Sequence, residues 1–173
     1  PLGISYMKAL GIPYRTEMLS AVLAGFIGFP FVILGGLMYD KFKRMYIPVI
    51  VGSAGLIALS AVYFPIIQTK NTFYIILAAV GVFAFLYISF GALGVILCNI
   101  FPVNMRYSGI GWTLQIATLI TGFLLSLSVP EFVKVSGGLI NAWPYVSLSV
   151  IVLSFLGSFS IFLLENKLSL LYR

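Results

Sequence analysis

Five long runs of residues without a formal charge limit what this chain can fold into. Each run is 21 to 29 residues long, and about 20 residues of α-helix cross the hydrocarbon core of a bilayer. Strands of a membrane β-barrel are only about ten residues long and alternate in hydropathy, so helices fit these runs better. We therefore expect an all-α integral membrane protein with five transmembrane helices. The predicted spans are residues 18–39, 46–68, 72–100, 109–130 and 144–164.

Composition supports the bilayer as the environment of this chain. Only 8% of the residues are charged, whereas soluble domains are about a quarter charged. The net charge of +6 does not indicate a nucleic-acid partner, because the bases are scattered through short connections. His is absent, and Cys98 lies alone in an apolar run. A zinc site and a Cys/His nucleophile pair therefore lack their residues, and we expect no metal and no cofactor.

The connections between the spans carry most of the charge. Residues 1–17 are predicted to form a loop with one short amphipathic piece after an absent helix, and residues 40–45 and 101–108 form two further loops. Residues 165–173 form a polar tail. Because Lys and Arg are more frequent in cytoplasmic loops, the charge distribution predicts a cytoplasmic loop 40–45 and a cytoplasmic C-terminus. The predicted cytoplasmic bases are Lys41, Lys43, Arg44, Arg106, Lys167 and Arg173, against Lys8, Arg15, Lys70 and Lys134 on the other side.

Prolines and small residues predict how the helices bend and pack. Pro30 lies inside the first span and cannot donate a hydrogen bond to the Phe26 carbonyl, so a bend is expected there. Pro130 is expected to end the fourth span. The chain begins at Pro1 without a signal peptide, and we expect a piece of a longer protein. A stripe of small residues in the fourth span predicts close approach of another helix: Gly109, Thr113, Ala117 and Thr121.

The densest charge in the sequence is the segment 40–44, which holds one acid and three bases. One interpretation is simple retention of positive charge on the cytoplasmic side. The other is functional: Asp40, beside Lys41 and Arg44, belongs to an ion-pair network or lies at a neighbouring helix N-terminus. Such a network breaks and re-forms as helices move, and both interpretations stay open.

None of the predicted spans contains an ionisable acid or base, so none offers a proton relay or ion site. An enzyme is not expected either, because the spans hold no cluster of catalytic groups. Three uncharged polar residues are candidates to face a solute. Gln115 needs hydrogen-bond partners in hydrocarbon, and these are either another helix or a solute. Tyr87 either points into a cavity or packs against lipid or a helix, and Thr118 is the third candidate.

Two loops resemble motifs of the major facilitator superfamily. Residues 36–44, Gly-Leu-Met-Tyr-Asp-Lys-Phe-Lys-Arg, resemble its cytoplasmic loop of Gly, three residues, Asp, a base, any residue, Gly and two bases. Residues 101–109, Phe-Pro-Val-Asn-Met-Arg-Tyr-Ser-Gly, are similar to a loop of its metabolite:proton symporter branch, which includes proline/betaine transporters. The two loops lie two helices apart, as in that branch. Lys43 stands where the motif has its glycine, and Met45 where it has its last base.

The resemblance implies the C-terminal part of a twelve-helix secondary transporter, covering its eighth to twelfth helices. Such proteins move a small organic solute, here coupled to H+, by rocking two six-helix halves around a central site. The partners implied are the solute, H+, the lipid bilayer of the plasma membrane and the absent N-terminal half. Asp40 and Arg44 would belong to a gate network with the motif positions Gly36 and Lys41, and Arg106 to an equivalent contact after the tenth helix.

Three alternatives stay open. Sugar porters of the same superfamily have a related Phe-Pro and Arg loop, but residues 164–168 match only the Glu and Lys of their Pro-Glu-Thr-Lys-Gly element. A small membrane subunit that scaffolds a partner without transport is the second. A membrane-embedded enzyme is the third and has the least support.

Overall fold

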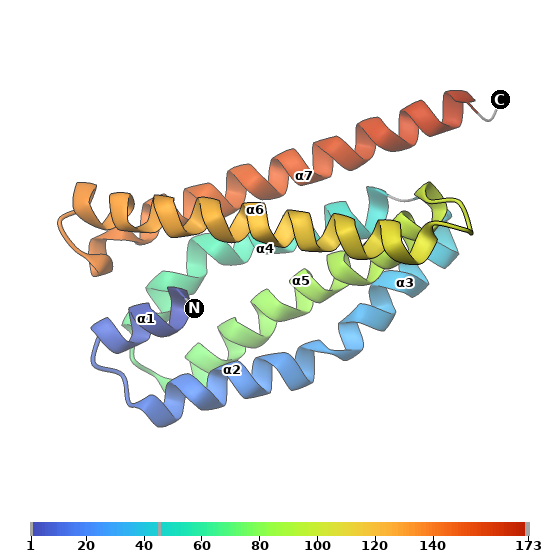
Figure 1. Cartoon of the computed structure of the whole chain (residues 1–173). Coiled ribbons are helices and arrows are strands. Elements are labelled where there is room, and N and C mark those ends of the chain that lie inside the picture. The colour runs from blue at the N-terminus through green and yellow to red at the C-terminus, as the bar shows by residue number, and fades with distance from the viewer. Residues whose placement is uncertain (1, 45, 172–173) are drawn as a thin grey trace.

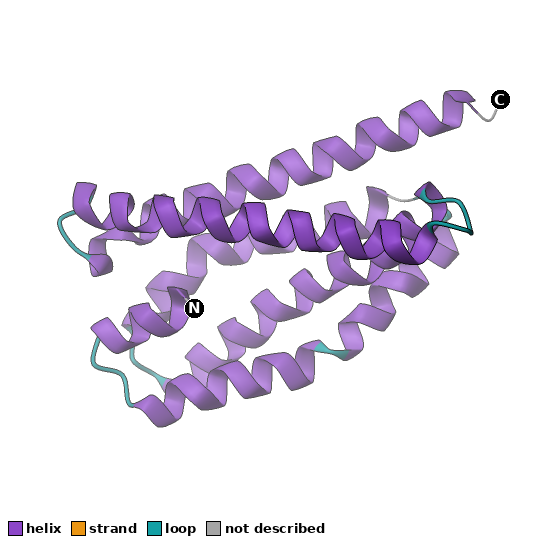
Figure 2. Cartoon of the chain, in the orientation of Figure 1, coloured by secondary structure: helices purple, strands orange, loops and turns teal. Residues whose placement is uncertain are grey.

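The structure, a computed structural model, describes residues 2–44 and 46–171. Every described element is a helix (Figure 2), and five helical segments are long and apolar enough to cross a membrane. The expected all-α class with five spans is confirmed, and the chain is an integral membrane protein. Met45 and Arg173, which enter the predicted loop motif and charge distribution, lie outside the described residues. The elements are α1 (Leu2–Ala9), α2 (Tyr14–Gly28), α3 (Pro30–Phe42), α4 (Tyr46–Gln68), α5 (Thr72–Ile100), α6 (Arg106–Val135), η1 (Leu139–Ala142) and α7 (Trp143–Leu171).

The first span is bent at Pro30, as its sequence position predicts. α2 ends at Gly28 and α3 begins at Pro30. Pro30 has no N–H to donate to the Phe26 carbonyl, whereas the N–H of Phe29 still donates to the Gly25 carbonyl at 3.1 Å. The span therefore consists of two helices set at an angle (Figure 1).

Pro130 does not end the fourth span, so that prediction is wrong. α6 continues through Pro130 to Val135. A proline removes one backbone hydrogen bond, and transmembrane helices tolerate this loss when local adjustments satisfy the freed carbonyl. Lys134 therefore lies in the last turn of α6 instead of a loop. Its Nζ is 2.8 Å from Oε1 of Glu131, one turn earlier.

Other helices also extend beyond the predicted spans. Residues 2–9 of the expected loop form α1, and α2 already begins at Tyr14. Arg106 opens α6, and α7 continues through Glu165 to Leu171. Charged residues mark the edge of the hydrocarbon core, but Lys, Arg and Glu are favourable helix formers wherever water reaches them. The first charge after an apolar run is therefore a poor marker of the helix end.

α5 lies at the centre of the packing. It packs along α2, α3 and α4, and α4 also packs against α7 (Figure 1). The backbones of α3 and α5 approach closely: a Cβ at Gly35 would collide with the carbonyl of Ile88, and a Cβ at Gly91 with that of Val32. Small buried residues allow such approach in membrane proteins. The buried residues of α5 are Ile75, Ala78, Ala79, Ala84, Ile88, Ala92, Ile96 and Leu97.

α1 closes the end of the bundle at which α4 ends and α7 begins. Tyr6 is only 2% exposed and packs edge-on against Phe64, with 5.0 Å between the ring centroids. Its hydroxyl accepts a hydrogen bond from Nε2 of Gln68 at 2.8 Å and donates to the Ile140 carbonyl at 3.4 Å. These contacts fasten α1 to α4 and η1.

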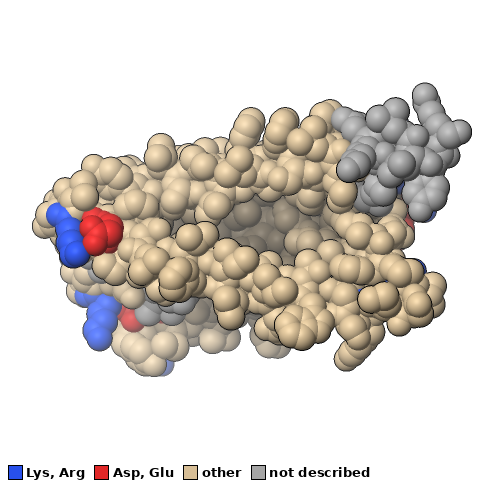
Figure 3. Space-filling view, turned by 45° about the horizontal axis from the view of Figure 1, so that its top comes forward, with Lys and Arg blue, Asp and Glu red and all other residues tan. Residues whose placement is uncertain are grey.

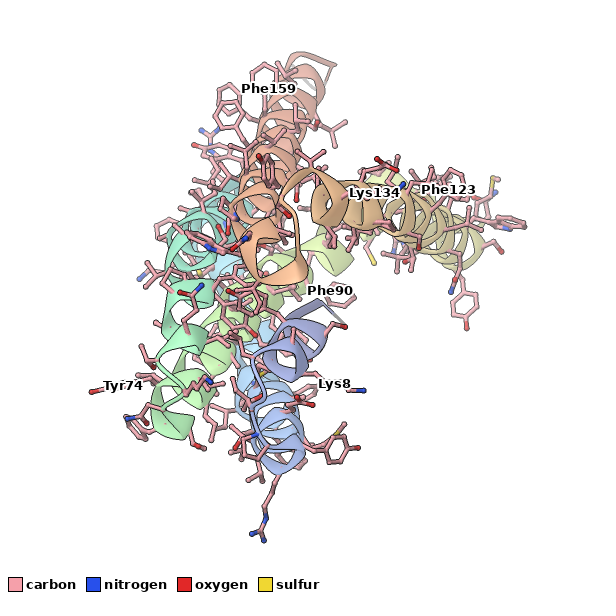
Figure 4. The ribbon with its side chains drawn as sticks, turned by 90° about the vertical axis from the view of Figure 1, so that its left-hand side faces the viewer. Lys8, Tyr74, Phe90, Phe123, Lys134 and Phe159 are labelled. Carbon is pink, nitrogen blue, oxygen red and sulfur yellow. The ribbon has the colours of Figure 1, made fainter. Side chains whose placement is uncertain are left out.

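α6 stands apart from the other helices (Figure 4, where Phe123 and Lys134 mark it). None of its described residues is buried. Limited contacts with α5, η1 and α7 leave most of its predicted small-residue stripe exposed within the described chain, although the Phe101 ring packs against Gly109. The hydroxyl of Thr113 donates to the Gly109 carbonyl at 2.8 Å, and that of Thr121 to the Ala117 carbonyl at 2.7 Å. The stripe therefore uses its hydroxyls within its own helix.

Candidate functional site

The segment 40–44 begins in the last turn of α3 and continues into a left-handed turn. Lys43 has φ 53° and ψ 27°, and its N–H donates to the Tyr39 carbonyl at 2.7 Å. Left-handed backbone is normally the place of glycine after a helix. The structure therefore retains the tight turn at the position where the superfamily motif has glycine, although Lys43 occupies it.

Asp40 lies at the surface beside Lys43. Its Oδ1 is 4.0 Å from the Lys43 Nζ, and the two side chains are 66% and 75% exposed. Exposed pairs of this kind contribute about 0.2–1 kcal/mol. The Lys41 ammonium lies over the Phe42 ring, 5.7 Å from its centroid. Asp40 is thus held loosely, and its charge is free to find another partner.

Arg44 contacts the far end of the chain instead of Asp40. Its Nη1 is 3.7 Å from Oε1 of Glu165, and Oε2 of the same carboxylate accepts the N–H of Tyr46 at 3.1 Å. The Glu165 side chain is only 13% exposed, against 60% for Arg44. Glu165 is the residue that sequence reasoning missed, because it was assigned to a polar tail. The match of residues 164–168 to the Glu and Lys of the sugar-porter element was the signal that could have drawn attention to it.

A second polar contact joins α3 to the end of α5. Nδ2 of Asn99 donates to the Tyr39 hydroxyl at 2.9 Å. Tyr39 directly precedes Asp40, and Asn99 lies two residues before Phe101, where the second motif loop begins. The two loops predicted from motifs therefore lie at the same end of the molecule and are connected through this hydrogen bond. Neither Tyr39 nor Asn99 was singled out from sequence.

Arg106 and Gly36, two further motif positions, lie in different surroundings. Arg106 opens α6, where a cation is disfavoured by the helix dipole, and its Nε is buried without a hydrogen-bond partner among the described residues. Buried donors nearly always have an acceptor, so the Nε–H of Arg106 is available to bind one. A Cβ at Gly36 would meet no atom within 4 Å, so the described packing does not explain that glycine, unlike its neighbour Gly35.

The three candidate solute-facing residues lie on two helices. Tyr87 of α5 packs against Gly28, where a Cβ would collide with its ring, and edge-on against Phe83. Thr118 of α6 donates its hydroxyl to the Leu114 carbonyl at 2.7 Å. Gln115 is exposed and lines a hollow of about 360 Å³ whose other lining residues also come from α6. The described chain does not bring Tyr87 and Gln115 into one cavity.

Glu17 lies just before the predicted first span, residues 18–39, but within α2, the helix that begins this span. It occupies the first turn of α2 and is 3% exposed. An acid is favoured near a helix N-terminus, but burying its charge is costly without compensation. Ser20, Ala24 and Gly28 are buried on the same helix. Successive members of the set that starts at Glu17 are three or four residues apart, which was visible in the sequence and places them on one face. Residues 18–39 contain no acid, but the helix that forms the first span begins before them and includes Glu17.

The arrangement concentrates polar chemistry at the ends of the helices. Figure 3 shows charged side chains at the ends of the molecule and an uncharged middle that is hollowed on this face. Among the described residues, no group of three or more acidic, Cys or His side chains is arranged to hold a metal ion. What the contacts at Tyr39, Arg44, Asn99 and Glu165 can do is hold neighbouring helix ends together reversibly.

Comparison with known proteins relates part of the chain to a transport protein. It is 25% identical over 112 residues to the inner membrane metabolite transport protein YhjE of Escherichia coli (strain K12). The matched stretch covers 64% of this chain and 25% of that protein, so the chain matches about a quarter of the relative's length. No family model matches the chain, and no solved structure matches it.

Proposed function

We propose that this chain is the C-terminal part of a secondary transporter of the major facilitator type, most like the metabolite:proton symporter branch. It contributes the eighth to twelfth helices and moves a small organic solute with H+ by alternating access of two halves. The polar contacts at one end of α3, α5 and α7 carry this proposal. They involve Arg44 of the first predicted motif loop and Asn99 beside the second. The similarity to a metabolite transport protein supports it.

In this proposal the polar contacts act as a gate on the cytoplasmic side of the plasma membrane. Closing the gate requires contacts that stabilise one access state by a small free energy and break within a transport cycle. The Arg44–Glu165 pair and the Tyr39–Asn99 hydrogen bond fit, because each is expected to contribute roughly 1 kcal/mol. A few such contacts together shift a two-state equilibrium substantially without locking it.

The second half of the transporter is the proposed partner of α6. α6 is 30 residues long and none of its residues is buried, so most of its surface is not covered by the described chain. The buried Nε of Arg106 also lacks an acceptor among the described residues. An N-terminal half that packs beside α6 would cover its exposed surface and provide an acceptor for Arg106. The proton-carrying groups are proposed to lie mostly in that half, with the buried Glu17 as a candidate in the present half.

A sugar porter is the second candidate, because Glu165, one of the two residues that match the sugar-porter element, makes the contact with Arg44. Uptake by the full-length protein in energised vesicles, with and without a proton gradient, separates the candidates. We expect uptake of an organic acid, osmolyte or amino acid that collapses with the gradient. Uptake of sugars alone would favour the porter. No uptake of any solute, together with stable capture of another membrane subunit, would favour the scaffold.

A further inference from the structure

An outward-facing groove runs between α4 and α7. Its volume is about 290 Å³, and each helix contributes residues spaced by three or four positions, which form one stripe per helix. Phe155 and Phe159 form part of its rim and are 65% and 51% exposed; Figure 4 shows Phe159 at the outer edge of α7. The apolar lining comes from Ile50, Ala54 and Ile57 of α4 and from Phe155, Phe159 and Phe162 of α7.

Two serines form the floor of the groove. Their Oγ atoms, on Ser53 and Ser158, are 2.6 Å apart. Because a hydroxyl has one proton, one serine donates to the other, which donates to a carbonyl of its own helix: either Ser53 to Val49, or Ser158 to Ser154 at 2.9 Å. The hydroxyls are satisfied by each other and by their own helices, so they require no polar ligand. The groove therefore selects an apolar occupant.

The groove is somewhat shorter than one leaflet of a bilayer. The lining runs from Ile50 to Ile57 along α4 and from Phe155 to Phe162 along α7, a rise of about 10 Å on each helix. A hydrocarbon core of about 30 Å gives each leaflet about 15 Å. The groove thus covers about two thirds of the thickness of a leaflet and accommodates part of one acyl chain.

Basic side chains lie at the outer end of the groove. The Phe162 ring meets the Tyr46 ring edge-on at 5.8 Å, and Arg44 lies two residues before Tyr46. Arg44 is 60% exposed and meets Glu165 through Nη1, which leaves further donors of its five N–H groups for a ligand. Lys43 and Lys41 lie in the same segment, and these three bases exceed the two nearby carboxylates, Asp40 and Glu165, by one charge, so this end attracts an anion. Basic side chains at the ends of grooves between transmembrane helices are suited to lipid head groups.

We propose that this groove binds one anionic phospholipid, with an acyl chain over the Ser53–Ser158 pair and the phosphate at Arg44. Bulk lipid is as apolar as the groove, so the chain alone gives little preference for this site. The preference comes from the charge of the head group, and it does not depend on the transport activity proposed above. A second copy of this chain seated in the groove is the competing occupant.

Native mass spectrometry of the full-length protein in detergent tests the proposal with added phosphatidylglycerol or phosphatidylcholine. We expect one retained phosphatidylglycerol in preference to phosphatidylcholine. Arg44→Gln lowers this preference about fivefold, the effect of one basic residue at a membrane surface. Ala54→Phe fills the groove at an exposed position and abolishes retention of the lipid even if Arg44→Gln fails to fold.

Two control variants match these changes outside the groove. Lys134→Gln removes an exposed base in the last turn of α6, outside the groove. Ala61→Phe adds the same ring at another exposed position, two turns after Ala54 on α4. Both retain phosphatidylglycerol as the unchanged protein does. Equal retention of the two lipids would overturn the proposal. So would full retention by Ala54→Phe, or lipid-free dimers that Ala54→Phe dissociates.

Discussion

The Asn99 side-chain amide donates a hydrogen bond to the Tyr39 hydroxyl, with 2.9 Å between Nδ2 and Oη. Tyr39 belongs to the last turn of α3 and Asn99 to that of α5, so the bond ties together the ends of two spans. Closer to the core, the same helices are held by contact of their backbones at Gly35 and Gly91. The inner contact is rigid, whereas the outer one is a single hydrogen bond that water can replace.

Tyr39→Phe removes this bond and should lower uptake more than it lowers stability. One exposed hydrogen bond contributes about 0.5–1.5 kcal/mol, which is enough to shift an access equilibrium several-fold. Initial uptake rates, normalised to the amount of protein in the membrane, measure the effect. Tyr74→Phe is the control, because Tyr74 is an exposed tyrosine near the other end of α5. Equal uptake by the two variants would contradict a gate role for Tyr39.

Asp40→Asn should also lower uptake more than membrane abundance. Asp40 is 66% exposed and lies 4.0 Å from the Lys43 Nζ, so its charge contributes little to folding. Glu131→Gln is a matched control, because Glu131 forms an exposed pair with Lys134 at the same spacing along α6. A vesicle assay with quantified protein separates the two effects. Equal losses of uptake and abundance for Asp40→Asn would assign it to folding.

The spans and the bend at Pro30 were predictable because each rests on a local rule. A bilayer requires about 20 apolar residues per helix, and a proline lacks its N–H wherever it stands. The partner of Arg44 follows no local rule. Glu165 accepts the N–H of Tyr46 from 119 residues away, and only the arrangement of α4 beside α7 brings the two together.

Two further features depended on information that apolar runs do not contain. The run that begins at Met18 gave no reason to include Glu17, although helical spacing joins Glu17 to the buried Ser20 and Ala24. The exposed position of α6 could not be predicted either, because its apolar side chains suit lipid and protein equally well. The site was therefore predictable as two loops but not as the contacts that join them.

Lys43→Gly should stabilise the protein slightly. Lys43 holds φ 53°, a backbone conformation that costs an L-residue about 1–2 kcal/mol and glycine almost nothing. The greater chain entropy of glycine offsets part of the gain, which leaves about 0.5 kcal/mol. Thermal unfolding in detergent should show a small rise in Tm. Lys41→Gly, within the last turn of α3, should lower Tm, and equal changes for the two variants would refute the backbone argument.

Gly35→Ala should destabilise the protein by about 1–3 kcal/mol, the range for overpacking. The new methyl group would collide with the Ile88 carbonyl, and a backbone atom cannot turn aside as a side chain does. The adjacent Gly36→Ala is the control, because no atom lies within 4 Å of a Cβ there and alanine favours the helix. Loss of folded protein by both variants alike would show that the contact between α3 and α5 is not the cause.

Gln115→Leu tests whether the hollow on α6 belongs to the solute path. The amide is exposed and lies in that hollow beside Trp112, so its hydrogen-bonding groups are available to a solute. Loss of one hydrogen bond should raise the apparent KM for uptake about two- to tenfold with little change in abundance. Thr118→Val is the control, because the Thr118 hydroxyl already donates to the Leu114 carbonyl and has no hydrogen left for a solute. Unchanged kinetics in Gln115→Leu would assign the amide to helix packing, and an equal rise in both variants would indicate a general disturbance of α6.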